Sequence, residues 1–284
     1  MSKAQEAALD IYRSVGFVQN YSDLRSARLV ARRVVRAMET QPNGTKERDM
    51  GSEYLEYERR WIFWLLIFVA GWYGAYTSAL RSGVFCNAQT ANVVFLAMYL
   101  ARQKWLSAAY LLLLISAYLF GSFLSEWLGK GVKHLHFLRW DTLMVALEMC
   151  VVVFLALMPA DWLDQICQVT LNFVCAMQFN TYCQMEGLLA ATTFVTNHIR
   201  QIVATLAMLI CYPESHDLRR KLKAHVLLFL CFTAGAVVST VMCGFFSYTS
   251  LLSALIPLAA VLICLAWADL LVEHRYFDAV LRGY

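Results

Sequence analysis

Residues 61–80 read WIFWLLIFVAGWYGAYTSAL, an uncharged stretch between the Arg59-Arg60 pair and Arg81. An apolar helix needs about 20 residues to cross the hydrocarbon core of a bilayer. The segments that approach this length are 61–80, 84–101, 105–128, 140–158, 163–184, 188–211, 222–246 and 249–272. Asparagine and glutamine residues interrupt 84–101 and 163–184 most often. The sequence therefore predicts an all-α, polytopic transmembrane helical bundle with six to eight spans.

The composition of the whole chain agrees with this prediction. Of the 284 residues, 60% are hydrophobic and 15% are charged, whereas a soluble domain is nearer half apolar and a quarter charged. A single water-soluble core is thereby excluded. The net charge of +4 is small and scattered, and no basic patch is interleaved with aromatic residues, so we expect no nucleic-acid partner.

Motifs for catalysis, cofactors and metals are absent from the sequence. It contains no glycine-rich phosphate loop and no nucleophile elbow. The nine cysteines lie in or beside apolar segments without a CxxC pair, which is typical of buried cysteines that act as small hydrophobic residues. His134 and His136 are too few to hold a metal ion. We therefore predict a protein that is not an enzyme and has no cofactor and no metal site.

Charge density divides the chain into three parts. Residues 1–60 form a charged N-terminal extension, 61–272 a transmembrane domain and 273–284 a short C-terminal tail. Within the extension, a helix over 24–38 would carry apolar residues on one face and four arginines on the other: Arg25, Arg28, Arg32 and Arg36. Such a basic amphipathic helix binds an anionic membrane surface or a partner subunit; the alternative is a solvated helix packed on the protein's own loops.

The transmembrane domain contains an internal repeat. Phe68-Val69-Ala70-Gly71 is followed by Thr90-Ala91-Asn92, and Phe173-Val174-Cys175-Ala176 is followed by Thr196-Asn197-His198. The spacing from the first Phe to the Thr is 22 residues in one copy and 23 in the other. This predicts duplicated halves, about 61–158 and 163–272, as in many membrane carriers. Four spans in each half would make the copies parallel, and three would make them inverted.

At these residues the chain resembles the YoaK family, bacterial multi-pass membrane proteins whose function is not established. The matching stretches are Gly71-Trp72-Tyr73-Gly74-Ala75, Gly83-Val84-Phe85 with Thr90-Ala91-Asn92, Ala176-Met177-Gln178-Phe179-Asn180, and Phe194-Val195-Thr196-Asn197. The resemblance covers 61–272 and implies a helical membrane scaffold. Gly74 stands where the family has an aspartate. A carboxylate within the membrane usually serves ion or proton movement, so its loss argues against a transport mechanism of that kind.

Polar residues inside the predicted spans point to a centre between the two halves. Glu148 and Arg200 are the ionisable residues nearest the middle of a span, and a charge there needs a partner or a wet cavity. We therefore hypothesise that they pair, or share one polar cavity with His198 and Gln178. The same centre would include Asn180, Thr90, Asn92, Thr196 and Asn197, together with Asn87 and Gln89. It would serve as a substrate or ion site, or as a clamp of hydrogen bonds between helices.

The distribution of Lys and Arg predicts that both termini lie on the cytoplasmic or matrix side. With eight spans, the inner connections carry Arg102, Lys104, Arg219, Arg220, Lys221, Lys223, Arg275 and Arg282, and the outer ones carry Arg81, Lys130, Lys133 and Arg139. The segment 129–139 opposes this assignment. We expect a bacterial-type inner membrane or the mitochondrial inner membrane.

Three functions compete for this sequence, and the third, a membrane enzyme, lacks a carboxylate pair, His cluster or nucleophile–base set at an aqueous edge. The first is a non-catalytic accessory or structural subunit of a membrane complex, because the membrane carboxylate is missing and the charged extension suits binding to other membrane subunits. The alternative is a small-solute or ion transporter with its polar site at the interface of the two halves. Either protein has the lipid bilayer as its partner.

Overall fold

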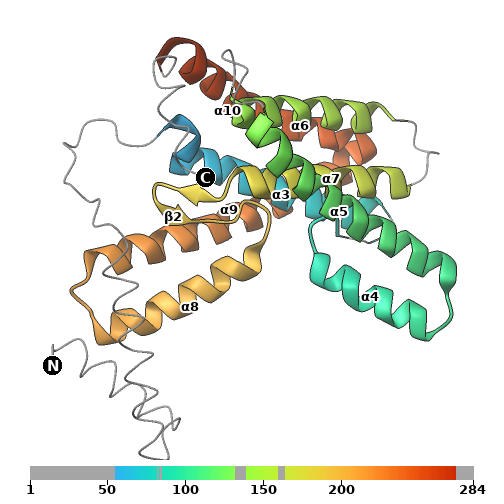
Figure 1. Ribbon diagram of the computed structural model, residues 1–284, viewed down its shortest axis with the longest axis horizontal. Helices are drawn as coiled ribbons and strands as arrows, with labels where there is room; N and C mark the ends of the chain where they lie inside the picture. The colour runs from blue at the N-terminus through green and yellow to red at the C-terminus, as the bar shows by residue number, and fades with distance from the viewer. Residues whose placement is uncertain (1–54, 82, 84, 132–138, 159–163, 273–284) are drawn as a thin grey trace, which may run out of the picture. The chain divides into compact units, whose positions relative to one another are not determined.

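The apolar stretch that follows Arg59 forms one helix, α3 (Arg60–Leu80), in the computed structural model of the chain (Figure 1). The structure describes residues 55–81, 83, 85–131, 139–158 and 164–272. The chain divides into two compact units, residues 1–53 and 54–284, and every described residue belongs to the second. The predicted amphipathic helix with Arg25, Arg28, Arg32 and Arg36 lies outside the described residues, as does the tail 273–284.

Every predicted apolar segment contains a helix, which confirms the all-α prediction. After the short turn η1 (Glu56–Glu58) and α3 come α4 (Gln89–Ala101), α5 (Trp105–Gly131), α6 (Trp140–Leu157), α7 (Asp164–Thr181), α8 (Val195–Cys211), α9 (His216–Phe246), η3 (Ser247–Ala254), α10 (Leu255–Trp267) and η4 (Ala268–Val272). A small hairpin of β1 (Gln184–Met185) and β2 (Leu188–Leu189) separates α7 from α8. Its two turn residues, Glu186 and Gly187, have φ of 46° and 76°, as a tight hairpin turn requires.

Four helical stretches are long and apolar enough to cross a membrane. They are α3, most of α5, α6, and the continuous stretch His216–Leu271 that contains α9 and α10. α7 has 18 residues, but polar side chains such as Gln168, Asn172 and Gln178 interrupt its apolar surface. α4 and α8 have only 13 and 17 residues. They are shorter than the predicted segments 84–101 and 188–211, because each segment begins with a loop or a hairpin instead of a helix.

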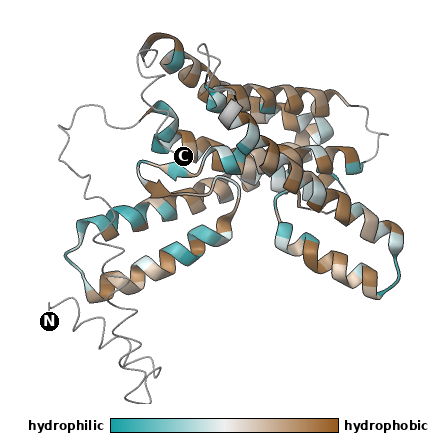
Figure 2. Ribbon diagram, viewed as in Figure 1, coloured by the Kyte–Doolittle hydropathy of each residue, from teal (hydrophilic) through white to brown (hydrophobic). Residues whose placement is uncertain are grey.

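The outer surface of the bundle is strongly apolar. α5 exposes Leu112, Leu113 and Phe123, and α9 exposes Val237 and Phe245. Figure 2 shows hydrophobic residues along most of the length of these helices, with shorter hydrophilic stretches between them. A soluble protein rarely exposes large contiguous apolar areas, whereas lipid-facing helices require them. The protein is therefore an integral membrane protein of the helical class.

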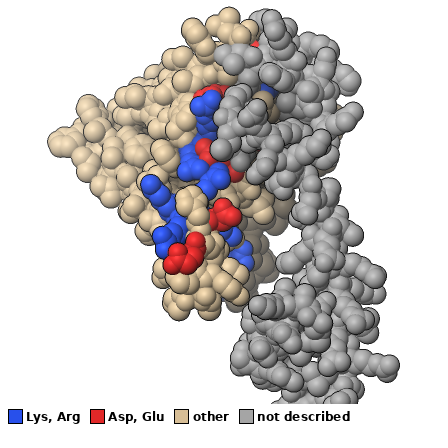
Figure 3. Space-filling model, turned by 90° about the vertical axis from the view of Figure 1, so that its left-hand side faces the viewer, with Lys and Arg blue, Asp and Glu red and all other residues tan. Residues whose placement is uncertain are grey.

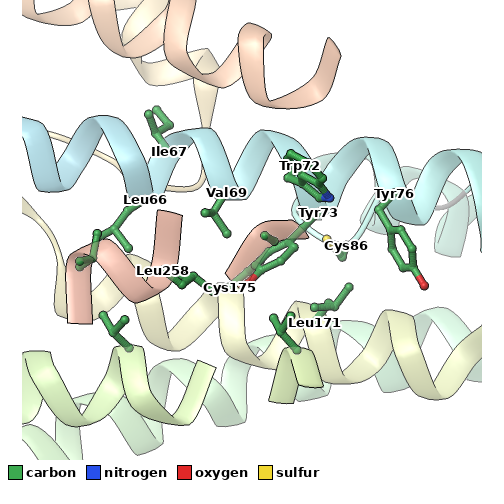
Figure 4. Close-up of a cluster of buried hydrophobic side chains, with 14 of the residues drawn as sticks. Leu66, Ile67, Val69, Trp72, Tyr73, Tyr76, Cys86, Leu171, Cys175 and Leu258 are labelled. Atoms are coloured by element: carbon green, nitrogen blue, oxygen red, sulfur yellow. The ribbon is translucent and has the colours of Figure 1, made fainter. Parts of the chain in front are cut away.

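The buried core surrounds α3. Leu66 and Tyr73 of α3 lie in one cluster with Leu171 and Cys175 of α7 and with Leu258 of α10, all of them 1% exposed or less (Figure 4). This cluster holds together helices from both halves of the sequence.

α3 and α7 run in opposite directions. Arg81, which follows the last residue of α3, binds Asp164, the first residue of α7, with 3.2 Å between Nη1 and Oδ1. At the other end, Arg60 opens α3 and binds Glu186 in the hairpin after α7, with 2.5 Å between Nε and Oε2. The two ion pairs therefore fasten both ends of an antiparallel pair, with the arginine at the α3 end and the carboxylate at the α7 end of each pair.

α9 runs parallel to α3, and the two helices lie in close contact. Ser239 Oγ donates to the backbone oxygen of Trp72 at 3.0 Å, and Gly235 faces the carbonyl of Phe68. A Cβ atom on Gly235 would overlap that carbonyl oxygen, and one on Gly71 would overlap the carbonyl oxygen of Phe232. Only residues without a side chain allow the backbones to approach so closely.

α5 runs parallel to α7 through contacts of the same kind. Asn172 Nδ2 donates to Leu114 O at 2.5 Å, and Ser125 Oγ donates to Met177 O at 3.2 Å. A Cβ atom on Gly121 of α5 would lie 2.6 Å from the backbone oxygen of Phe173. The contact between α5 and α7 therefore resembles the contact between α9 and α3.

α6 and α10 complete the bundle, again in opposite directions. Trp140, at the start of α6, donates from Nε1 to Thr181 Oγ1 at the end of α7, at 3.0 Å. Thr142, near the same start, donates to Asp269 Oδ2 just after α10, at 2.6 Å. α6 is therefore antiparallel to both neighbours.

These directions determine the path of the chain through the bundle. α3, α6 and α9 run one way, and α5, α7 and α10 run the other. Because α3 and α5 are opposed, the connection between them must return to the side on which it began, and the same holds for the connection between α7 and α9. α4 and α8 therefore add no net crossing of the bundle.

Candidate functional site

The connection between α3 and α5 turns back along α3. Asn87 Nδ2 donates to the backbone oxygen of Ala70 at 3.2 Å, and Cys86 N donates to Thr77 Oγ1 at 3.3 Å. Ala70 lies ten residues before the end of α3, which corresponds to roughly 15 Å along a helix. The segment 81–88 thus reaches about the middle of α3, and α4 begins there.

The connection between α7 and α9 reaches the same place. The amide of Asn87 also contacts the backbone oxygen of Thr193, with 3.4 Å between Nδ2 and O. Thr193 immediately precedes Phe194, the residue that caps the N-terminus of α8. Ala88, which follows Asn87, caps α4. One side chain therefore joins the starts of two helices that are distant in sequence.

α4 and α8 leave this junction in opposite directions (Figure 1). α4 connects to α5 through a short turn at 102–104 and returns beside it, while His198 of α8 contacts His225 of α9, which places α8 antiparallel to α9. Because α5 and α9 are themselves opposed, α4 and α8 point away from each other. Their N-termini face one common region.

Neither helix start has a side-chain cap. The residues at the N-cap positions, Ala88 and Phe194, make no side-chain hydrogen bond to the first turn, and neither first turn contains an acidic residue. The first N–H groups of a helix have no partner within the helix. In addition, the hydroxyl groups of Thr192 and Thr193 are buried without a hydrogen-bond partner among the described residues. The junction therefore concentrates hydrogen-bond donors.

Ion pairs anchor both returning segments at their far ends. Arg81, a 0% exposed residue, holds the first segment through Asp164 and stacks on Tyr248, with Cζ 4.4 Å from the ring centroid. Glu186 holds the second segment and accepts from both Arg60 and Arg220. The charged side chains at this second end gather on one face, as Figure 3 shows.

The sequence of the chain matches a known protein family. Residues 62–267, which extend from α3 into α10, match the family described as "protein of unknown function (DUF1275)". The chain belongs to the DUF1275 family. The YoaK-like proteins that it resembles are members of this family. No curated protein and no solved structure is significantly similar to the chain. The junction of α4 and α8 lies within the part that the DUF1275 family shares.

Glu148 and Arg200 of this DUF1275 protein have different partners. Glu148 is 0% exposed and its Oε1 accepts from the hydroxyl of Tyr73 at 2.9 Å. Arg200 is exposed, and its Nη2 lies 3.5 Å from Asn197 Oδ1. No ion pair joins Glu148 and Arg200 in the described part of the chain. The reason is their placement, because α6 packs on α7 and α10, whereas α8 packs on α9.

The polar residues near α4 form a connected group. Asn92 is buried and donates to Gln89 Oε1 at 3.4 Å, and Gln89 in turn donates to Asn172 of α7. Thr90 and Thr196, in contrast, are exposed in the first turns of α4 and α8. Asn92 is thus linked through Gln89 to α7, and no hydrogen bond joins it to Thr90, Thr196 or Asn197 among the described residues.

The remaining predicted residues lie apart from one another. Gln178 donates to Leu66 O at 3.4 Å, and Asn180 donates to Ala176 O within its own helix at 2.8 Å. His198 is buried against Ala191 and His225, with 2.7 Å from Nε2 to Ala191 O and 2.9 Å between the two Nδ1 atoms.

The histidine pair has a defined pattern of hydrogens. Because the Ala191 carbonyl only accepts, His198 Nε2 carries a hydrogen. For two neutral rings, His225 Nδ1 then donates to His198 Nδ1. His225 Nε2 remains an acceptor, buried and without a partner in the described structure.

One functional position escaped the sequence reasoning. Arg81 was interpreted as a loop cation, and nothing near it in sequence indicates Asp164 or Tyr248. Asn87 was expected at the polar centre, but its bonds to Ala70 and Thr193 depend on tertiary structure. As for metals, no three His, Cys, Asp or Glu residues lie together as ligands within the described ranges.

Proposed function

We propose that this DUF1275 protein moves a small solute across the membrane along the junction of α4 and α8. The observation that carries the proposal is the bond from Asn87 to Thr193, which joins two segments that return part-way along the bundle. Backbone that is not helical is tolerated at membrane depth only when it is buried in protein or lines a cavity. In secondary transporters, interrupted helices of this kind form the substrate site.

A pseudo-twofold arrangement of the two halves supports this function. α3 packs on α9 as α7 packs on α5, α4 on α5 as α8 on α9, and α6 on α7 as α10 on α3. Asn87 follows Phe68 by 19 residues and Thr193 follows Phe173 by 20, so the bonded pair occupies matching positions. Because α3 and α7 are antiparallel, we infer inverted halves, the arrangement that allows alternating access around a central site.

The charge distribution supports one orientation of the six spans. The connections 129–139 and 182–224 fall on the side of the N-terminus, which removes the conflict that 129–139 caused with eight spans. That side carries Arg59, Arg60, Lys130, Lys133, Arg139, Arg200, Arg219, Arg220, Lys221, Lys223, Arg275 and Arg282, and the opposite side carries Arg81, Arg102 and Lys104. By the positive-inside rule, both termini are cytoplasmic, or in the matrix.

The accessory subunit stays as the second candidate because of the charged extension. Residues 1–60 are suited to binding a partner subunit, and the proposed solute path does not include them. In this reading, the junction of α4 and α8 only closes the bundle.

Two measurements separate these functions. The first is uptake of a panel of labelled small solutes into liposomes that contain the purified full chain. We expect saturable uptake that Asn87→Ala abolishes and Thr240→Ala leaves intact, because exposed Thr240 bonds only to Ala236 O in its own helix. Size-exclusion profiles show whether both variants fold.

The second is native-gel sizing and mass spectrometry after mild extraction from membranes. A chain that runs alone or as a small homo-oligomer supports the transporter. A large assembly of unlike subunits that releases the chain when residues 1–50 are deleted, together with no uptake, overturns it in favour of the accessory subunit.

A further inference from the structure

The junction of α4 and α8 has a positive electrostatic potential. Two helix N-termini face it, and each is equivalent to roughly half a positive charge. Helices that carry no ligand usually balance this potential with an acidic residue in the first turn or with a side-chain cap. α4 and α8 have neither.

Two hydroxyl groups at the junction also have no acceptor for their hydrogen atoms. The carbonyl of Thr193 is occupied by Asn87, but its hydroxyl is buried at 1% exposure without a partner among the described residues, and Thr192 is in the same situation. Each of these hydroxyl groups can donate a hydrogen bond, as can the first N–H groups of both helices, which have no partner within the helix. A group that accepts several hydrogen bonds and carries negative charge would satisfy them together.

Acidic side chains do not fill this role in the described structure. Glu148 is held by Tyr73, and Tyr73 points about 100° around α3 from its neighbour Gly74. Gly74 is the residue of α3 that faces the junction, since a Cβ atom there would lie 3.2 Å from Asn87 Oδ1. The position therefore lies in close contact with Asn87 and carries no charge.

We propose that the junction binds a small anion, held by the first-turn N–H groups of α4 and α8 and by the hydroxyl of Thr193. The inference deepens the proposed transport function, since it makes an anion the transported solute. Binding itself, however, can be tested without transport.

The test measures binding to the purified full chain in detergent. The probes are the sodium salts of chloride, nitrate, formate, acetate, phosphate and sulfate at constant ionic strength, with choline chloride, urea and glycerol as cationic and neutral comparisons. The readout is the rise in thermal midpoint with concentration. We expect saturable stabilisation by at least one anion, because a ligand that binds only the folded state raises its stability.

Gly74→Asp and Gly74→Asn form a matched pair of equal bulk. The aspartate places a negative charge beside Asn87, so we expect its anion affinity to be at least about tenfold below that of the asparagine variant. Thr193→Val removes the free hydroxyl and should weaken binding several-fold. Thr233→Val is its control, because exposed Thr233 bonds only to Phe229 O in its own helix.

The outcomes distinguish the two proposals. Equal affinity in the two Gly74 variants, no effect of Thr193→Val, or saturation only by a neutral or cationic solute overturns the anion site. Uptake of a neutral solute or cation without anion binding leaves the transporter standing and removes the anion. Anion binding without any uptake leaves the anion site standing and removes the transporter.

Discussion

The close contact between α3 and α9 makes a quantitative prediction for Gly235→Ala. The new Cβ would overlap the carbonyl oxygen of Phe68, which is backbone and cannot rotate away. The helices must therefore separate, and such overpacking typically costs about 1–3 kcal/mol. Alanine returns up to about 1 kcal/mol through its higher helix propensity. We expect a net loss of about 1–2 kcal/mol, or roughly 2–8 °C in thermal midpoint for a chain of this size.

The matched control is Gly244→Ala in the same helix. A Cβ on Gly244 meets no atom within 4 Å, so this variant should be as stable as the natural protein or slightly more stable. The assay is the fraction of monodisperse protein that remains after heating in detergent, because unfolding of membrane proteins is commonly irreversible and needs an operational midpoint. Equal midpoints for the two variants would refute the close packing of α3 against α9.

Three further predictions concern topology and buried polar groups. A cysteine at Gln103 should react with impermeant maleimide from outside, and one at Glu214 only from inside; reaction of Gln103→Cys from inside would restore eight spans. Arg81→Met should cost about 1–3 kcal/mol, because it removes the bond of a buried guanidinium to Asp164, which is itself partly exposed, and a midpoint that hardly moves would show that the pair is solvated. Glu148→Gln should preserve stability, since its amide oxygen can accept from Tyr73, whereas Glu148→Leu should lose about 1–3 kcal/mol by leaving that hydroxyl unpaired; equal thermal midpoints for the two would contradict the bond.

Sequence reasoning identified the helices but not the path of the chain through the bundle. Hydropathy detects apolar residues over 84–101 and 188–211 wherever they lie, so it cannot separate a span from a helix that begins part-way into the bundle. The deciding contacts are Asn87 with Ala70 and with Thr193. The second of these joins residues 106 positions apart, and no local pattern records it.

The candidate site divides in the same way. Asn92 and His198 were expected at the centre because they are polar residues in apolar surroundings, and both are buried near the helix starts that meet there. The predicted pairing of Glu148 with Arg200 was drawn from depth in the membrane alone. Depth says nothing about which helices are neighbours, and α6 and α8 pack against different ones.

The sequence by itself determined that this protein lies in a lipid bilayer, that it is all-helical and which family it belongs to. These depend on composition, on the length of apolar runs and on short motifs, all of which are local. Tertiary structure alone decided the relative directions of the helices, the burial of Arg81 and the meeting of two uncapped helix starts. Each of those depends on contacts between residues that are distant in sequence, and such contacts form only when the packing of one helix against another brings their partners together.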